Sequence, residues 1–303
     1  MGYAVVPMYT GEIANDRIRG AVSGMLDPVV NVAVVITYSL GPWVSIQALA
    51  IVGGIMPLIF GLIFIWMPES PYFLIMKEKP DQAMKSLSWL RGTSDVSEEL
   101  KMIKENVESE RKNAGTFRDL IMIPGNRKAL IIIVGLMVAQ QLSGISAVVA
   151  YSSLIFEASG SSLDPSISVI IFGVVQTLAG VLCVFMVDLT GRRILLLFST
   201  FGTILFLVGL AVYYQLQANG IDVSSVSWLP VIFMVGFILI CTIGLGALPY
   251  VVLSEIFPCN VKASATMIAN IAPFLSSVAV TKVYQVVADA YGVHVSFWGF
   301  AGL

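Results

Sequence analysis

The sequence predicts an all-α polytopic membrane protein, and three observations lead to this prediction. Of the 303 residues, 57% are hydrophobic and 12% are charged, with a mean hydropathy of +0.88, whereas a soluble domain carries about 25% charged residues. The charges are clustered, so that residues 28–68, for example, include none. Such stretches exceed the roughly 20 residues that a membrane helix needs, and their continuous hydrophobicity excludes the alternating strands of a barrel.

Six long uncharged stretches set the expected helices. The first, residues 28–68, has room for two helices, and Gly41-Pro42 provides the break between them. With the apolar segments at both ends of the chain, we expect nine membrane helices, the first and last of them incomplete. They are expected at about residues 1–12, 20–40, 46–67, 128–157, 166–187, 194–216, 228–254, 263–288 and from 296 onward.

The basic residues define the orientation of these helices. Sixteen of the 17 Lys and Arg residues fall in alternate connections, and therefore on one side of the membrane. By the positive-inside rule this side is the cytosol. The exception, Lys282, is expected to reach the outer interface.

One segment, residues 69–127, has the composition of a soluble region. Asp81 is expected to cap an amphipathic helix that ends at Gly92, and Leu100 and Ile103 are expected to line the buried face of another. Two interpretations stay open: a solvated linker, or a cytosolic helical bundle that tethers two membrane halves. The expected divisions of the chain are residues 1–68, the end of an N-terminal bundle; 69–127, the cytosolic helical linker; and 128–303, the C-terminal bundle.

A short internal repeat links the two ends of the chain. Glu12 precedes Arg19 by seven residues, and Glu255 precedes Lys262 by the same interval. Each pair is expected to span a cytosolic turn, and parallel repeats of this kind are typical of transporters in which two bundles rock about a central site. The pairs either latch a cytosolic gate or are ordinary structural ion pairs.

Four motifs follow one another along the chain. They are Glu12 to Gly20 (E-x6-RG), Pro68 to Pro71 (PESP), Gln140 to Ile145 (QQLSGI) and Asp188 to Arg193 (DLTGRR). Together they resemble the signatures of the sugar transporter family of the major facilitator superfamily, and within it those of the insect trehalose facilitators. The resemblance implies a twelve-helix fold, of which the chain covers the part from inside the fourth helix to the start of the twelfth. We therefore expect a partial fold that lacks helices one to three and most of the twelfth.

The resemblance also implies a sugar site around Gln140 and Gln141. An amide inside the membrane costs free energy unless it is hydrogen-bonded, and it offers both a donor and an acceptor to a hydroxyl-rich solute. Gln176 stands where the family has a sugar-binding asparagine, and Asp27 stands where it has a sugar-contacting glutamine. The alternative for the glutamines is hydrogen bonding between helices, and the alternative for Asp27 is capping of a helix interrupted by Pro28.

The sequence departs from the family pattern at several of the implied sugar contacts. An asparagine is replaced by Ser146, and the first of two tandem tyrosines is lost before Tyr151. The motif GPGPIPW becomes Gly244 to Tyr250, with the loss of two prolines and the tryptophan, and an Asn-Trp pair falls at Pro273-Phe274. These changes remove donors and stacking surface, so glucose specificity cannot be carried over. The expected sugar-binding residues are Gln140, Gln141, Ser146, Tyr151, Gln176, Asp27, Tyr250 and Phe274.

The gate at the cytosolic face is expected to consist of charged residues from these motifs. They are Glu12, Arg19, Glu69, Asp188, Arg192, Arg193, Glu255 and Lys262.

The predicted function is facilitative transport of a sugar, a hexose or trehalose, by alternating access across the plasma membrane. Two alternatives stay open: a non-transporting sugar sensor or degenerate paralogue, and a proton-coupled symporter that uses Asp27. We expect no enzyme, metal site or cofactor, because no His, Cys or Ser constellation is present. The net charge of −2 argues against a nucleic-acid partner, which leaves a sugar or polyol, the lipid bilayer and, for a symporter, a proton.

Overall fold

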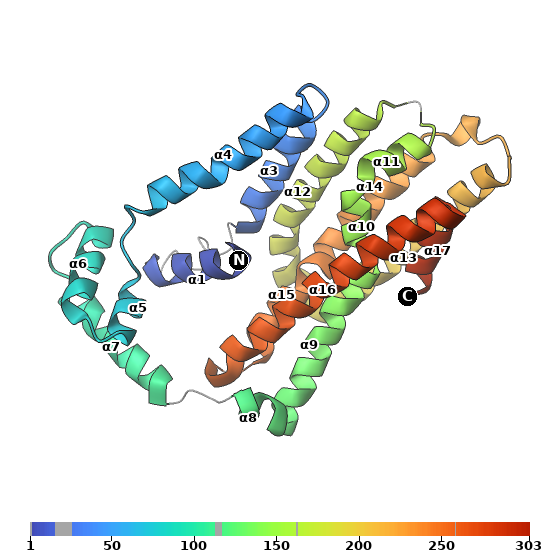
Figure 1. Cartoon of the computed structure of the whole chain (residues 1–303). Helices are drawn as coiled ribbons and strands as arrows, with labels where there is room; N and C mark the ends of the chain where they lie inside the picture. Colours follow the sequence, from blue (N-terminus) through green and yellow to red (C-terminus); the bar gives the residue numbers. More distant parts are fainter. Residues whose placement is uncertain (1, 16–25, 113–116, 162, 258) are drawn as a thin grey trace. The chain divides into compact units, whose positions relative to one another are not determined.

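The computed structural model describes residues 2–15, 26–112, 117–161, 163–257 and 259–303, which form helices and their connections with no strand (Figure 1). This confirms the all-α class. The described chain divides into two compact units, the first made of residues 1–33 and 40–114 and the second of residues 34–39 and 115–303.

The first unit combines membrane-type helices with short amphipathic ones. Its elements are α1 (Gly2–Ile13), the two ends of α3 (Leu26–Leu40), α4 (Ile46–Phe64), α5 (Pro71–Met76), α6 (Pro80–Arg91) and α7 (Ser97–Lys112). Ser45 begins α4 by accepting a hydrogen bond from the Ala48 N–H at 3.3 Å. None of the residues of α4 is buried, as expected for an apolar helix whose solvent is lipid.

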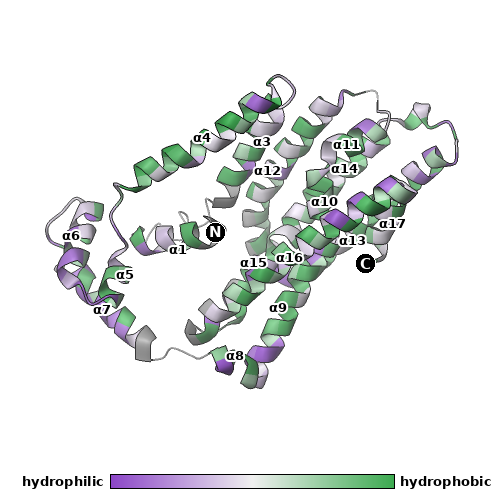
Figure 2. Ribbon diagram, in the orientation of Figure 1, coloured by the Kyte–Doolittle hydropathy of each residue, from purple (hydrophilic) through white to green (hydrophobic). Residues whose placement is uncertain are grey.

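The amphipathic helices α5, α6 and α7 share a small apolar core of their own. Its buried side chains are Leu74, Ala83, Leu87, Val96, Leu100, Ile103 and Val107. Figure 2 shows hydrophilic residues concentrated on α6 and α7, whereas α4 is apolar along most of its length. Residues 71–112 are therefore a packed helical cluster and not a solvated linker.

The start of α6 differs from the expectation that Asp81 caps it. The N-cap position is Lys79, no side chain caps the helix there, and Asp81 lies inside the first turn. Pro80 explains the difference, because its fixed φ and missing N–H suit the first helical position. The expected end is confirmed: Gly92 adopts the left-handed conformation (φ +67°) and closes the helix.

The second unit is a bundle of long apolar helices. Its elements are α8 (Phe117–Met122), α9 (Pro124–Leu142), α10 (Ile145–Ala150), α11 (Ser152–Ala158), α12 (Pro165–Thr190), α13 (Arg192–Ala218), the 3-10 helix η1 (Ser224–Val226), α14 (Leu229–Cys241), the π-helix η2 (Thr242–Gly246), α15 (Leu248–Ile256), α16 (Cys259–Tyr291) and α17 (Val293–Gly302). Helix α13 packs against α14 and α17, and α9 packs against α16 (Figure 1). In the connection before η1, hydrogen bonds from the Ser224 hydroxyl and N–H lower the pKa of Asp222.

Six helical spans among the described residues are long and apolar enough to cross a membrane. They are Ile46–Phe64, Pro124–Ala150, Pro165–Cys183, Arg192–Ala218, Ser224–Leu253 and Ser264–Tyr291. A shorter apolar segment lies at Val29–Leu40. Each matches a helix expected from the uncharged stretches, and the chain is an integral, multi-pass membrane protein.

Two of the expected helices are interrupted. The helix expected at 128–157 is divided at Gly144, which has φ +80°, and again at Tyr151. The helix expected at 228–254 is divided by η2. Both breaks depend on close tertiary packing: a Cβ at Gly144 would lie 2.5 Å from the ring of Phe300, and a Cβ at Gly244 would collide with Ser199.

Replacing Gly144 by alanine is therefore expected to destabilise the protein. A left-handed φ costs an L-residue about 1–2 kcal/mol, and overpacking against Phe300 adds about 1–3 kcal/mol. Thermal unfolding of the detergent-solubilised protein measures the loss. Gly135→Ala on α9, where a Cβ meets nothing within 4 Å, is the matched control and should be neutral or stabilising. Equal unfolding temperatures for the two variants would contradict this assignment.

Candidate functional site

The two glutamines lie in the last turn of α9, directly before the break at Gly144. Gln140 is 5% exposed and Gln141 is 8% exposed, so both amides are buried in the second unit. The Ser143 hydroxyl donates to the backbone carbonyl of Gln140 at 2.6 Å, which satisfies one of the acceptors that the helix end leaves open.

Gln140 joins α9 to the π-helix. Its amide nitrogen donates to the carbonyl oxygen of Gly246, the last residue of η2, at 3.0 Å. A carbonyl can only accept, so this bond determines which end of the amide faces Gly246. The other end, Oε1, is buried and receives no hydrogen bond from the described residues. Gln140 therefore presents an unused acceptor in a buried position, where an unmet acceptor costs free energy.

Gln141 is held in a different way. Its Oε1 accepts a hydrogen bond from the Ser146 hydroxyl at 2.6 Å. Ser146 lies in the first turn of α10, so the bond crosses the break at Gly144 and orients the amide. The structure thus places Gln141 against Ser146, with Gln140 beside them on α9; that these residues share a sugar site stays a prediction.

Neighbouring helices satisfy the backbone of the π-helix with small polar side chains. The Ser199 hydroxyl on α13 donates to the Ile240 carbonyl at 2.8 Å and accepts from the Leu245 N–H at 3.0 Å. The Cys183 thiol on α12 donates to the Ile243 carbonyl at 3.0 Å. Sequence reasoning missed both residues, although small polar side chains inside apolar stretches are a recognisable sign of contacts between membrane helices.

The other predicted sugar-binding residues have more varied positions. Gln176 on α12 is half-buried, with a buried Oε1 that receives no hydrogen bond from the described residues. Tyr151, between α10 and α11, stacks on Tyr284 with 5.2 Å between the ring centroids. Tyr250 and Phe274 are 45% and 63% exposed. Asp27 is in α3, but its side chain lies outside the described part of the structure.

In the described part of the second unit, an ion pair joins two of the predicted gate residues. Arg192, at the start of α13, donates to Glu255, in the last turn of α15, at 2.8 Å. Among the described residues, Glu255 pairs with Arg192 and not with Lys262 or Arg193. Arg19 and the side chain of Asp188 lie outside the described residues.

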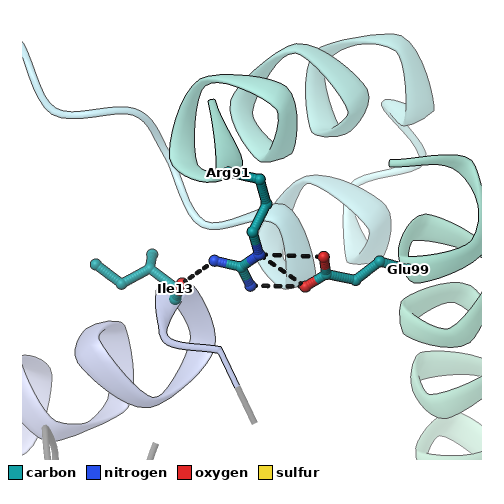
Figure 3. A network of polar contacts seen from close by, with 3 residues as sticks. All are labelled: Ile13, Arg91 and Glu99. Carbon is teal, nitrogen blue, oxygen red and sulfur yellow. Dashed lines mark hydrogen bonds and ion pairs between the residues drawn. The ribbon is translucent and has the colours of Figure 1, made fainter. Parts of the chain in front are cut away.

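In the first unit, a guanidinium network meets the end of α1. Figure 3 shows Arg91 of α6 between Ile13 and Glu99. The Arg91 guanidinium donates to the Ile13 carbonyl at 3.0 Å and to the Glu99 carboxylate at 2.6 Å. It also lines a polar cavity of about 230 Å³, whose walls include Glu12, Asn15, Tyr72, Glu99 and Asn106.

The remaining gate candidate of this unit, Glu69, makes mainly backbone contacts. Its carbonyl accepts from the Ser86 hydroxyl at 2.5 Å, and its carboxylate accepts from the Ser70 N–H at 3.4 Å. Sequence reasoning did not identify Arg91 or Glu99, because their eight-residue separation crosses a turn and matches no helical period.

Comparison with known proteins identifies the family. The family model described as "Sugar (and other) transporter" matches residues 1–303. The chain belongs to this family. It is 33% identical over 304 residues to the facilitated trehalose transporter Tret1 of Anopheles gambiae, covering 98% of this chain and 38% of that protein. With Tret1 of Bombyx mori it shares 33% identity over 300 residues, covering 97% of this chain and 59% of that protein.

Solved structures of the xylose transporter XylE from E. coli have the same fold. A partially occluded inward-open form matches with a TM-score of 0.77 and 23% identity, over 98% of this chain and 63% of that chain. XylE described as a proton:xylose symporter, bound to 6-bromo-6-deoxy-D-glucose, matches with a TM-score of 0.69 and 25% identity, over 98% and 64%. The fold is that of the major facilitator superfamily, and the chain spans less than two thirds of these relatives.

Removal of the Arg91 network is expected to destabilise the first unit. Hydrogen bonds to charged groups contribute about 1.5–3 kcal/mol when partly shielded from water, and the Arg91 side chain is 18% exposed. Arg91→Lys keeps the charge but loses the forked geometry. Thermal unfolding of the purified protein should detect a loss of about 1–2 kcal/mol.

Lys101→Ala provides the control for Arg91→Lys. The Lys101–Glu105 pair is 4.0 Å long with side chains 80% and 67% exposed, so its loss should cost well under about 1 kcal/mol. The network would have no structural role if Arg91→Lys were as stable as Lys101→Ala.

Proposed function

We propose that the protein carries a sugar or a similar polyol across the plasma membrane by alternating access, with residues 69–127 on the cytosolic side. The observation that supports this most directly is the buried pair Gln140 and Gln141 beside a broken membrane helix. A buried amide inside a membrane bundle is costly unless it is hydrogen-bonded, and the protein meets only part of the hydrogen-bonding capacity of this pair. One of its amides holds an unused acceptor, which suits a hydroxyl donor.

Trehalose and hexoses are the first substrates to test. The relatives named for facilitated trehalose transport are 33% identical to this chain, while XylE is described as a xylose transporter. The replacements at Ser146, Tyr250 and Phe274 change both the hydrogen-bonding groups and the aromatic surface of the expected site. We therefore propose a sugar as the substrate class and leave its identity to the assay.

Proton coupling is a second candidate. It is favoured by the carboxyl residue Asp27 in the apolar helix α3 and by the XylE relative described as a proton:xylose symporter. A carboxyl group within a membrane segment can carry a proton between the two sides. An inward current on addition of substrate at low external pH, abolished in Asp27→Asn, would support symport over facilitated diffusion.

Saturable uptake of radiolabelled trehalose or a hexose by the intact protein in proteoliposomes is the expected outcome. Gln141→Ala should weaken apparent affinity by about 2- to 13-fold, because it removes a neutral hydrogen bond worth about 0.5–1.5 kcal/mol. Gln215→Ala is the control, since this amide on α13 bonds to Asn219 at the exposed end of the helix. Saturable binding without uptake would identify a sensor, and the absence of both would refute the proposal.

Neutralising Glu255 is expected to loosen the cytosolic end of α15. Its partner Arg192 and Glu255 itself are 41% and 50% exposed, so the pair contributes about 0.2–1 kcal/mol. Glu255→Gln should therefore raise the reactivity of a single cysteine at position Ile256 by about 1.4- to 5-fold. Glu157→Gln, an exposed carboxylate on α11, is the control. Unchanged reactivity would reduce the pair to a surface contact without a gating role.

A further inference from the structure

The nitrogen and the oxygen of the Gln140 amide have different surroundings. The nitrogen is used by the Gly246 carbonyl at 3.0 Å, and the oxygen is buried without a donor among the described residues. The amide nitrogen of Gln140 thus contacts the helix break, and its amide oxygen is available to accept a hydrogen bond from a hydroxyl group. Gln141 does not share this arrangement, because its contact runs to Ser146 on the adjoining α10.

The Gln140–Gly246 hydrogen bond lies at a different point of η2 from the contacts made by α12 and α13. Ser199 and Cys183 bond to Ile240, Ile243 and Leu245, and so attach the earlier part of the break to α13 and α12. Gln140 bonds to Gly246, the last residue of η2, which only Ala247 separates from α15. The attachment to α9 is therefore placed at the hinge between η2 and α15.

Helix α15 carries the effect of this attachment to the cytosolic ion pair. It is nine residues long, from Leu248 to Ile256, and it holds Glu255 in its last turn. It packs on α9, α13 and α16, and Ile256 lies against the apolar cluster that α9 and α16 share. A short rigid helix thus connects the Gln140 contact to the Glu255–Arg192 pair.

We propose that Gln140 is a positioning residue that couples sugar occupancy to the position of α15. This rests on the proposed function. A sugar hydroxyl that donates to Oε1 polarises the amide and strengthens its N–H bond to Gly246, since hydrogen bonds in series reinforce one another. Occupancy then favours the state in which α15 is attached to α9. By linkage, that state binds the sugar more tightly by the same factor.

The experiment measures the reactivity of a cysteine at position Ile256 in the intact protein, with Cys259 replaced by serine. Without sugar, Gln140→Met should raise this reactivity by about 2- to 13-fold, the factor for one neutral hydrogen bond. Gln215→Met, at an exposed amide on α13 outside the proposed site, is the matched control and should leave it unchanged. Equal reactivity in the two variants overturns the proposal.

The second arm of the experiment repeats the reactivity measurement with radiolabelled sugar at a saturating concentration, and a binding measurement confirms that the sugar is bound. In the unmodified protein and in Gln215→Met, sugar should lower the reactivity at position 256; in Gln140→Met this response should be lost. A full response in Gln140→Met overturns the coupling. If Gln140→Met fails to fold, Gln140→Asn replaces it, because the shorter amide keeps its polar groups but cannot reach Gly246.

The two arms separate this inference from the proposed function. If no sugar is bound or transported, the proposed function fails. The difference between Gln140→Met and Gln215→Met without sugar then still decides whether Gln140 positions α15.

Discussion

A membrane helix that breaks must have its freed backbone groups satisfied by protein, because hydrocarbon offers no hydrogen bonds. The second unit meets this constraint at η2 with side chains from three helices, namely Gln140 from α9, Cys183 from α12 and Ser199 from α13. The direction of α15 beyond the break therefore depends on these contacts. The buried Gln140, the tight approach at Gly244 and the Glu255–Arg192 ion pair all lie on the segments that these contacts join.

The chemistry of this break differs from that of a proline kink. Two of the three prolines in the corresponding family motif are absent here, and glycines at 244 and 246 stand in the π-helix. A proline enforces a break covalently, by removing a donor and clashing with the preceding turn. Hydrogen bonds worth about 0.5–1.5 kcal/mol each enforce it more weakly, so a ligand that alters one of them can shift the equilibrium of the whole helix.

Hydropathy was sufficient to place the six long apolar spans of the described chain, because an uncharged run longer than the bilayer core has few other stable forms. It could not locate the breaks, which depend on partners distant in sequence: Gly144 meets Phe300, and Gly244 meets Ser199. The same limit applies to the site. Motifs identified Gln140 and Gln141 as a pair, but their different partners arise only when α9, α10 and η2 are packed together.

Among the described residues, Glu12 and Glu255 of the sequence repeat have different contacts; Arg19, the basic partner of Glu12 in the repeat, lies outside them. Glu255 forms an ion pair with Arg192, whereas Glu12 lines a polar cavity together with Arg91. The Arg91 guanidinium donates to the Glu99 carboxylate and to the Ile13 carbonyl. Arg91 belongs to the amphipathic cluster and so attaches that cluster to the end of α1. The two carboxylates share a place in the sequence repeat, but among the described residues the neighbouring arginine comes from a different kind of element: Arg91 of the amphipathic α6 for Glu12, and Arg192 of the apolar α13 for Glu255.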